Sequence, residues 1–569
     1  MKKWLLQGGV LLLLVMLAGF GIWHVAAHAA SRQTLQTLQK MTIKIGKKTV
    51  TKKTYQLEKG KSAKLAVSFT PRTAKVTLQY KSSDKRVVQV SKNGKITAKK
   101  EGTAKIQVTA TTNGKKKEKK STYVTIQVTV PAKEALYPQH EPYGTGVGAV
   151  PGRVVWAYDP DSVEWDGSGY WWETDHFDEK IILNMLNESI ASLGGKETAE
   201  EGWEALFAAH NEARKADSGN GVSGSGDSAG KSSTDDAPAG YQKREKIAIK
   251  ANINGSGVFD DDTSGKTDLS YTNPVLLKAL LRSLVEEAGV RPADITVYDV
   301  SRLFPDYMVQ MCTEGTLKGV RFVGRNNGVA DETAPIQWSY SFRGNVNYMP
   351  TCVTEAAYII NLANLKGHSY GITLCGKNHF GSFINGNAMR PPEGANLHQF
   401  LAGGTMNEYS PLTDLMAQHQ LGEKTALYLL DAIICAPSEG ASITKENATW
   451  EQAPFLGDYT SSIFISQDPV AIDSVGADFL ANEPAVISRN GVLRGNPNVE
   501  NYLHEAGLVG NAPSGTVYYN GNGERVENLG VHEHWNNSEE KQYSRNLGKE
   551  EGIELILLHQ EEDFKKTDR

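Results

Sequence analysis

The hydrophobic pattern of the chain changes near residue 130, and this change divides it into parts that must fold differently. Over residues 41–130, apolar and polar positions alternate with a period of two and turn residues recur about every 8–12 positions, as in an all-β sandwich. From residue 152 onward, helical apolar stripes alternate with short apolar runs. A length of 569 residues gives room for about two to four domains. We predict a multidomain chain in which an all-β sandwich precedes an α/β layered domain with a mostly parallel sheet.

Charge is distributed as unevenly as hydrophobicity. Residues 31–130 contain 25 Lys and Arg against 4 Asp and Glu, whereas the net charge of the whole chain is −4, so the remainder is acidic. Such a basic segment is typical of a part that contacts a polyanion. The alternative is that the lysines only solvate strand faces and oppose edge-to-edge pairing.

The first 30 residues have the pattern of an export signal. Lys2 and Lys3 precede a largely apolar run over residues 4–27, and Ala27-His28-Ala29 has the small residues of a cleavage site. Because about 20 apolar residues span a bilayer, residues 1–30 are predicted either as a cleaved signal peptide or as an uncleaved signal anchor. Both interpretations make the protein extracytoplasmic, secreted or membrane-anchored at the cell surface, where no nucleic acid partner is expected.

Residues 41–130 contain a hairpin signal. Val88 and Val90 lead into Asn93-Gly94, the dipeptide preferred in type I′ turns. The neighbouring motifs are Tyr80-Lys81-Ser82-Ser83-Asp84, Gly94-Lys95-Ile96-Thr97-Ala98 and Gly102-Thr103-Ala104. They resemble the bacterial Ig-like domain (group 2), and the resemblance implies a spacer or adhesive module without catalytic residues. With its charge, we expect this domain to contact an anionic cell-wall polymer or a membrane surface.

Two further segments are predicted to lack a core of their own. Residues 131–151 contain four prolines and are predicted to form a linker. Residues 217–240 are rich in Ser, Gly and Asp with almost no apolar side chains, which predicts a disordered insertion. This insertion interrupts the α/β domain, which we expect over residues 152–569.

The predicted strands of the α/β domain end in polar residues. We expect these strands at residues 246–250, 295–300, 357–362, 427–434 and 462–466. The polar residues at or after their ends are Lys250, Asn252, Asp299, Asn364, Lys366, His368, Asp431 and Asp468. Each is a common turn or cap former on its own. Because ligands bind at the carboxyl ends of strands in open α/β sheets, the recurrence predicts a binding site there.

Several stretches in this domain resemble the domain-of-unknown-function 362 family. They are Ile249-Lys250-Ala251-Asn252, Asn364-Leu365-Lys366-Gly367-His368, Gly371-Ile372-Thr373-Leu374-Cys375-Gly376-Lys377-Asn378 and Ser466-Gln467-Asp468-Pro469. With flanking motifs, the resemblance spans roughly residues 150–555, and it implies no particular reaction because the family has none agreed. Many relatives carry a ferredoxin-like iron–sulfur segment. The four cysteines here form no CxxC pair, so no iron–sulfur cluster is expected.

These motifs suggest roles for individual residues. We predict His368, Lys366 and Asp468 as catalytic residues, with His368 as acid/base and Asp468 as an orienting carboxylate. Asp468 has a structural alternative as the N-cap of the following helix. The ligand-binding residues are predicted to be Lys250, Asn252, Lys377 and Asn378, with the lysines gripping an anion. Residues 371–377 also have P-loop spacing, but Asn378 replaces the hydroxyl that would contact Mg²⁺.

Histidines provide a second hypothesis. His532 and His534 are two positions apart, so on a strand both point the same way and Glu533 points the opposite way. With His379, or with His368 or His398, they are predicted to bind a divalent metal. The alternative is that they are ordinary polar or packed histidines.

Together these features predict an exported bacterial surface protein whose α/β domain binds an anionic small molecule or envelope component. If this domain is an enzyme, it also transforms the bound molecule. One alternative is a non-catalytic cell-envelope binding protein, in which Trp156, Trp165, Trp171 and Trp172 stack on sugars. Another is a metal-dependent redox or isomerising enzyme that uses the histidines.

Overall fold

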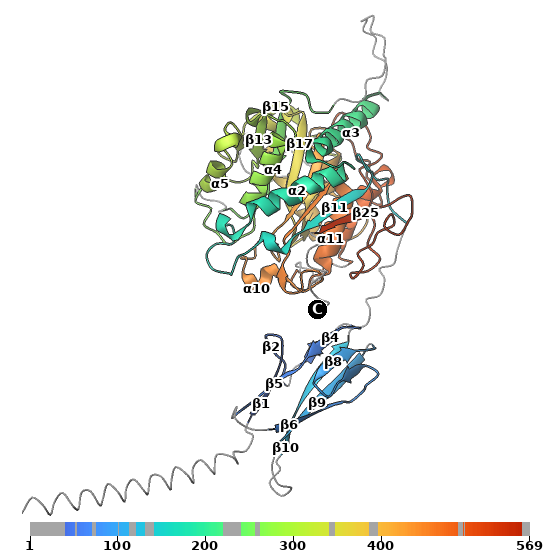
Figure 1. The fold of residues 1–569 in the computed structure, drawn as a ribbon. Coiled ribbons are helices and arrows are strands. Elements are labelled where there is room, and N and C mark those ends of the chain that lie inside the picture. Colours follow the sequence, from blue (N-terminus) through green and yellow to red (C-terminus); the bar gives the residue numbers. More distant parts are fainter. Residues whose placement is uncertain are drawn as a thin grey trace, which may run out of the picture. The chain divides into compact units, whose positions relative to one another are not determined.

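The computed structural model describes residues 40–51, 54–57, 59–70, 76–100, 102–112, 121–130, 141–219, 240–256, 262–340, 347–385, 397–486, 493 and 495–559. The chain divides into two compact units between Ala135 and Leu136 (Figure 1). The predicted signal segment, residues 131–140 of the predicted linker and residues 220–239 of the predicted insertion lie outside the described residues. Within the described ranges, no helix is both long enough and apolar enough to cross a membrane.

The described part of the N-terminal unit consists of β-strands. They are β1 (Lys40–Ile45), β2 (Lys48–Thr49), β3 (Thr54–Gln56), β4 (Ser62–Lys64), β5 (Ala66–Thr70), β6 (Val76–Ser82), β7 (Val88–Val90), β8 (Lys95–Ala98), β9 (Gly102–Thr112) and β10 (Ser121–Val130). The sheet orders are β2-β1-β5, β3-β10-β9-β6 and β4-β8-β7. On β9, Ala104, Ile106 and Val108 are buried while Thr103 and Lys105 are exposed. The period-two pattern therefore places one face of this strand in the core.

The predicted hairpin lies between β7 and β8, which pair antiparallel with Val90 opposite Ile96. Gly94 has a positive φ of 80°, whereas Asn93 does not. A type I′ turn requires positive φ at both central residues, so the hairpin is confirmed but its predicted type I′ turn is wrong. The amide of Gly94 instead donates to the carbonyl oxygen of Ser91.

The C-terminal unit is built around an eight-stranded sheet in the order β14-β13-β12-β17-β21-β24-β11-β25. β24 is antiparallel to both of its neighbours, and the remaining adjacent pairs are parallel. The sheet is therefore mixed, with more parallel than antiparallel pairs. The strand bounds are β11 (Arg153–Tyr158), β12 (Ile247–Lys250), β13 (Ile295–Tyr298), β14 (Arg321–Val323), β17 (Tyr358–Asn364), β21 (Thr425–Ala432), β24 (Ser462–Ser466) and β25 (Glu554–His559).

Helices pack on both faces of this sheet (Figure 1). Val155 and Ala157 of β11 lie in the core that contains α2 and α4, and Val154 and Trp156 lie in the core that contains α11 and α12. The helix bounds are α2 (Glu179–Leu193), α3 (Ala199–Gly219), α4 (Pro274–Glu286), α5 (Asp306–Met311), α6 (Thr351–Thr354), α7 (Cys375–Asn378), α8 (Gln399–Ala402), α9 (Pro411–Ala417), α10 (Lys445–Ala448), α11 (Pro469–Ala481) and α12 (Pro497–Gly507). Because α3 continues to Gly219, the first three residues of the predicted insertion, 217–219, belong to this helix.

Smaller sheets complete the unit. They comprise β15 (Ala330–Pro335), β16 (Asn347–Pro350) and β20 (Ile384–Asn385); the hairpin of β18 (Lys366–His368) and β19 (Gly371–Thr373); and the pair β22 (Thr449–Trp450) and β23 (Asp458–Tyr459). The tryptophans fill the interior, because Trp156, Trp165 and Trp171 are at most 3% exposed. These three rings are not available to stack on a sugar.

Candidate functional site

Four neighbouring parallel strands bring polar residues to one edge of the large sheet. Lys250 ends β12, Asp299 follows β13, Asn364 ends β17 and Asp431 lies near the end of β21. All four side chains are buried. Because these strands are adjacent and parallel, their carboxyl ends meet, as parallel-sheet geometry requires.

Lys250 and Asn378 join this edge to α7. The ammonium of Lys250 donates to Asp299 Oδ2 at 3.0 Å and to Asn378 Oδ1 at 3.3 Å. Burial is the main cause that lowers the pKa of Lys250. The Asn378 amide donates to Asn361 Oδ1 and to backbone carbonyls of Lys250 and Leu362, and its oxygen also accepts from Asn252 Nδ2. Asn378 therefore links β12 and β17 and contacts the ammonium of Lys250.

Lys366 and Lys377 extend the set of cations. The fully buried ammonium of Lys366 donates to Asn252 Oδ1 at 3.2 Å and to the Ser270 carbonyl at 3.0 Å, and burial lowers its pKa to about 8. The ammonium of the partly exposed Lys377 lies 3.8 Å from the centroid of the Phe380 ring. Burial is the main cause that lowers the pKa of Lys377 to about 7; the charge of Glu439 opposes it, and repulsion from Lys366, Arg302 and Lys250 adds to it. We call Lys250, Arg302, Lys366 and Lys377 the cation cluster.

His368 is buried and lies close to the cation cluster. Its Nδ1 accepts a hydrogen bond from the Tyr370 amide at 3.0 Å, and its Nε2 lies 3.9 Å from Glu439 Oε1. Its ring stacks on His398 with a centroid distance of 5.6 Å. Burial, together with the charge of Lys377, lowers the pKa of His398 to about 3. The structure thus places the predicted residues His368, Lys366 and Lys377 in one neighbourhood.

Asp468 lies elsewhere, and the prediction that it serves this site is wrong. It follows β24, which is antiparallel to β21, so its end of the strand lies at the opposite edge of the sheet. Its carboxylate accepts hydrogen bonds from the amides of Val470 and Ala471 at the start of α11, and from Val147 and Val531. It is therefore a helix N-cap that also holds two distant segments.

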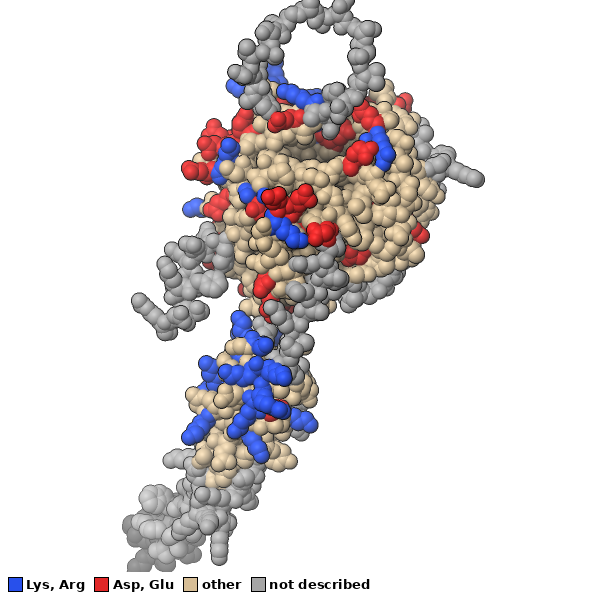
Figure 2. Space-filling model, turned by 90° about the vertical axis from the view of Figure 1, so that its right-hand side faces the viewer, with Lys and Arg blue, Asp and Glu red and all other residues tan. Residues whose placement is uncertain are grey.

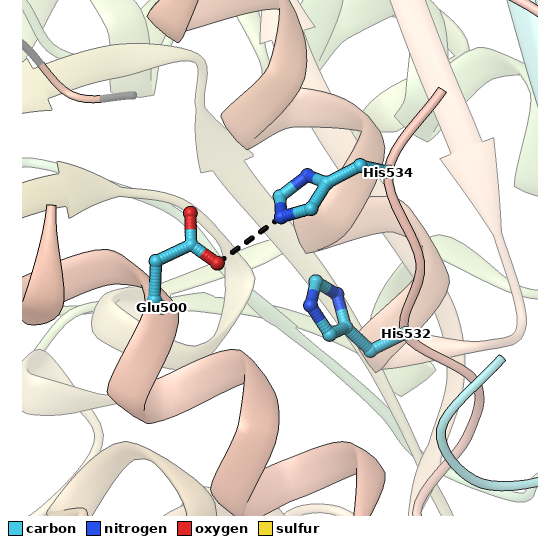
Figure 3. Close-up of side chains that lie close together, drawn as sticks. All are labelled: Glu500, His532 and His534. Atoms are coloured by element: carbon cyan, nitrogen blue, oxygen red, sulfur yellow. Dashed lines mark hydrogen bonds and ion pairs between the residues drawn. The ribbon is translucent and has the colours of Figure 1, made fainter. Parts of the chain in front are cut away.

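The predicted histidine cluster forms, but with a different third member. His532 and His534 point the same way and their ring centroids are 5.0 Å apart, whereas Glu533 turns away and accepts from Ser544 and Ile553. Glu500 of α12 faces both histidines (Figure 3). His379, predicted as a ligand, instead lies beside Asn361 and Ser382, on the side of Lys250. The third candidate ligand is therefore Glu500.

Sequence reasoning assigned no role to several residues that build the site. Arg302 and Glu439 lie in loops, so no strand end marks them, and His398 was considered only as a metal ligand. Asp473 of α11 accepts hydrogen bonds from the amides of Cys375 and Gly376, both at 2.9 Å, and so positions α7. Asp473 lies five residues after Asp468 in the sequence, but spacing alone does not identify its partner.

Comparison with protein families confirms the resemblances in the expected order. Residues 45–121 match the bacterial Ig-like domain (group 2), and residues 247–478 match the domain of unknown function DUF362. No curated protein matches the chain. The DUF362 match contains the whole cation cluster, whereas Glu500, His532 and His534 lie beyond it.

Proposed function

We propose that the C-terminal unit binds an anionic small molecule or envelope component, through a carboxylate or phosphate group, at the cation cluster. The observation that carries this proposal is that four cations gather at one end of the sheet, where Lys377 is partly exposed as a residue while Lys250 and Lys366 are buried. An anion at the Lys377 ammonium forms charge-assisted hydrogen bonds. It also offsets the repulsion among cations that lowers the pKa of Lys377.

The surroundings of Lys377 support an approach from this side. Tyr370, Phe380, His398 and Glu439 are partly exposed, unlike the lysines behind them. Because Nδ1 of His368 accepts a backbone hydrogen bond, Nε2 is the nitrogen that carries a transferable proton, and Glu439 Oε1 lies 3.9 Å from it. An enzyme would use this proton on the bound anion, and a binding protein would use it only as a hydrogen-bond donor.

The N-terminal unit supports a second function, attachment to the cell envelope. Lys and Arg side chains are spread over the face of this unit shown in Figure 2, and Asp84, paired with Arg86, is the only acidic residue among its described residues. A basic Ig-like domain fits contact with an anionic wall polymer or membrane surface. The exposed lysines are Lys44, Lys47, Lys48, Lys59, Lys61, Lys64, Lys81, Lys85, Lys92, Lys95, Lys99, Lys100 and Lys105.

Anion binding is tested by thermal unfolding and calorimetry of the whole chain with sulfate and with citrate. We expect either anion to raise the melting temperature of the C-terminal unit. The Lys377→Met variant should lose this effect. The matched control is Lys246→Met, because Lys246 is a partly exposed lysine, like Lys377, but precedes β12 and pairs with Glu355. If Lys377→Met responds to anions as the wild type does, the site assignment is wrong.

Envelope attachment is tested by sedimentation of the same chain with purified cell wall at increasing salt. Contact through many lysines predicts release as the salt concentration rises, because screening weakens exposed charge pairs. Replacement of Lys44, Lys64 and Lys81 by Ser should lower binding, and Lys377→Met should not. Retention at high salt, unchanged by the Ser substitutions, would contradict a polyanion contact.

A further inference from the structure

We propose that Glu500, His532 and His534 bind one divalent transition-metal ion. One ligand atom from each residue lies within 4.8 Å of those from the other two. His534 Nε2 is 3.1 Å from Glu500 Oε2. In a tetrahedral zinc site with bonds of about 2.1 Å, neighbouring ligand atoms are about 3.4 Å apart, so the side chains need to move little to bind an ion.

Both histidine rings are held through Nδ1 by the same helix. The hydroxyl of Ser474 donates to the Val470 carbonyl at 2.7 Å, so it accepts from His532 Nδ1–H at 2.9 Å. Asp478 Oδ1 accepts from His534 Nδ1–H at 2.8 Å. Ser474 and Asp478 are four residues apart on α11 and therefore lie on one face of it. These hydrogen bonds select Nε2 of each ring as the ligand atom, as in metal sites where an outer carboxylate or hydroxyl orients the imidazole.

The segment that carries the histidines is itself fixed. The amide of His532 donates to the Tyr143 carbonyl at 2.8 Å, and the Tyr143 amide donates back at 2.9 Å. The other oxygen of Asp478 accepts from the Trp535 amide and from the Tyr543 hydroxyl. This arrangement keeps the two rings and Glu500 facing one another (Figure 3). Such fixed ligands lower the entropy lost when an ion binds.

The ligand types select the kind of ion. Two imidazoles and one carboxylate suit Zn²⁺, Co²⁺, Ni²⁺ or Fe²⁺, whereas Ca²⁺ and Mg²⁺ prefer oxygen ligands throughout. Glu500, His504 and His534 are partly exposed, whereas His532 is fully buried, so solvent approaches the site from the side of Glu500 and His534. We assign three protein ligands and a remaining position for water, the arrangement of catalytic rather than structural zinc sites. His504 lies at the rim, with its Nε2 3.8 Å from Glu500 Oε2.

The test uses the whole chain, purified without a polyhistidine tag, treated with a chelator and titrated with Zn²⁺ or Co²⁺. We expect one equivalent of bound metal by elemental analysis and a higher melting temperature, with no such effect from Mg²⁺. His532→Ala and Glu500→Gln should each weaken binding by at least about 100-fold, and Ser474→Ala by about tenfold. His504→Ala should retain one equivalent, and its loss would overturn the three-ligand assignment.

The matched control is His176→Ala, because His176 also lies beside two carboxylates, those of Glu173 and Asp175, but belongs to no three-ligand group among the described residues. It should leave metal binding unchanged. If the protein binds neither Zn²⁺ nor Co²⁺, the three side chains form an ion-pair network only. The same conclusion follows if Ser474→Ala and Glu500→Gln both bind these ions with wild-type affinity. Neither outcome depends on anion binding at the cation cluster.

Discussion

Replacement of Lys366 by Met tests whether the buried charge of the cation cluster lowers the free energy of unfolding of the C-terminal unit. The Lys366 ammonium is fully buried, and its pKa falls from 10.5 to about 8, chiefly because of burial. One pKa unit corresponds to about 1.4 kcal/mol, so a charged Lys366 costs the folded state about 3 kcal/mol at pH 7. Met removes this cost but leaves the acceptors on Asn252 and Ser270 unpaired, at about 1 kcal/mol each. We therefore expect Lys366→Met to be about 1 kcal/mol more stable than the wild type at pH 7.

The sign of this effect changes with pH. Because the folded-state pKa of Lys366 lies below the unfolded value, the unfolded chain binds more protons between about pH 8 and 10.5, and wild-type stability rises across this window. The variant lacks this contribution of about 3 kcal/mol, so at pH 10.5 it should be the less stable protein by about 2 kcal/mol. Urea unfolding followed by tryptophan fluorescence measures the difference, since beyond residue 30 every tryptophan lies in the C-terminal unit. Equal destabilisation at both pH values, or the same profile in Lys246→Met, would refute the reasoning.

Three further predictions follow from the contacts described in the Results. With the pKa of Lys377 at about 7, loss of its proton lowers sulfate affinity by roughly 100-fold between pH 7 and 9.5 by calorimetry, and a flat profile would contradict anion binding there. Asp468→Ala removes a cap and leaves buried amides unpaired, so the unfolding free energy falls by about 2–4 kcal/mol, against less than about 0.5 for exposed Asp458→Ala. Gly530→Ala lowers the melting temperature, because Gly530 has a φ of 141° and a Cβ there would lie 2.0 Å from Asp468 Oδ1; an unchanged value would argue against this packing.

The central strands were predictable because each is a nearly continuous apolar run. β12, β13, β17, β21 and β24 all lie within or close to the expected ranges, as strands buried on both faces should. β11 and β25 were not predicted as members of this sheet. Arg153 pairs with Glu554 across about 400 residues of sequence, and local periodicity carries no information about such a pairing.

The same limit explains which site residues were found. Lys250, Lys366 and Lys377 lie in or beside recognisable motifs at strand ends, and the fold places them in one neighbourhood. Asp468 was misplaced because periodicity does not reveal strand direction, and β24 runs opposite to β21. Glu500 was missed because a carboxylate on an amphipathic helix has no local feature that distinguishes a ligand from a solvated side chain.

Adjacent residues of α11 provide the sharpest separation of the two candidate sites. The Asp473 carboxylate holds α7, which carries Lys377, through the amides of Cys375 and Gly376, whereas the next residue, Ser474, holds His532. Asp473→Asn should therefore weaken sulfate binding by about tenfold and leave Zn²⁺ binding unchanged, and Ser474→Ala should do the reverse. Calorimetric titration of both variants with both ions distinguishes a positioning role from a general loss of helix packing. If each substitution weakens the binding of sulfate and of Zn²⁺ equally, α11 acts only as a scaffold and neither residue positions its site.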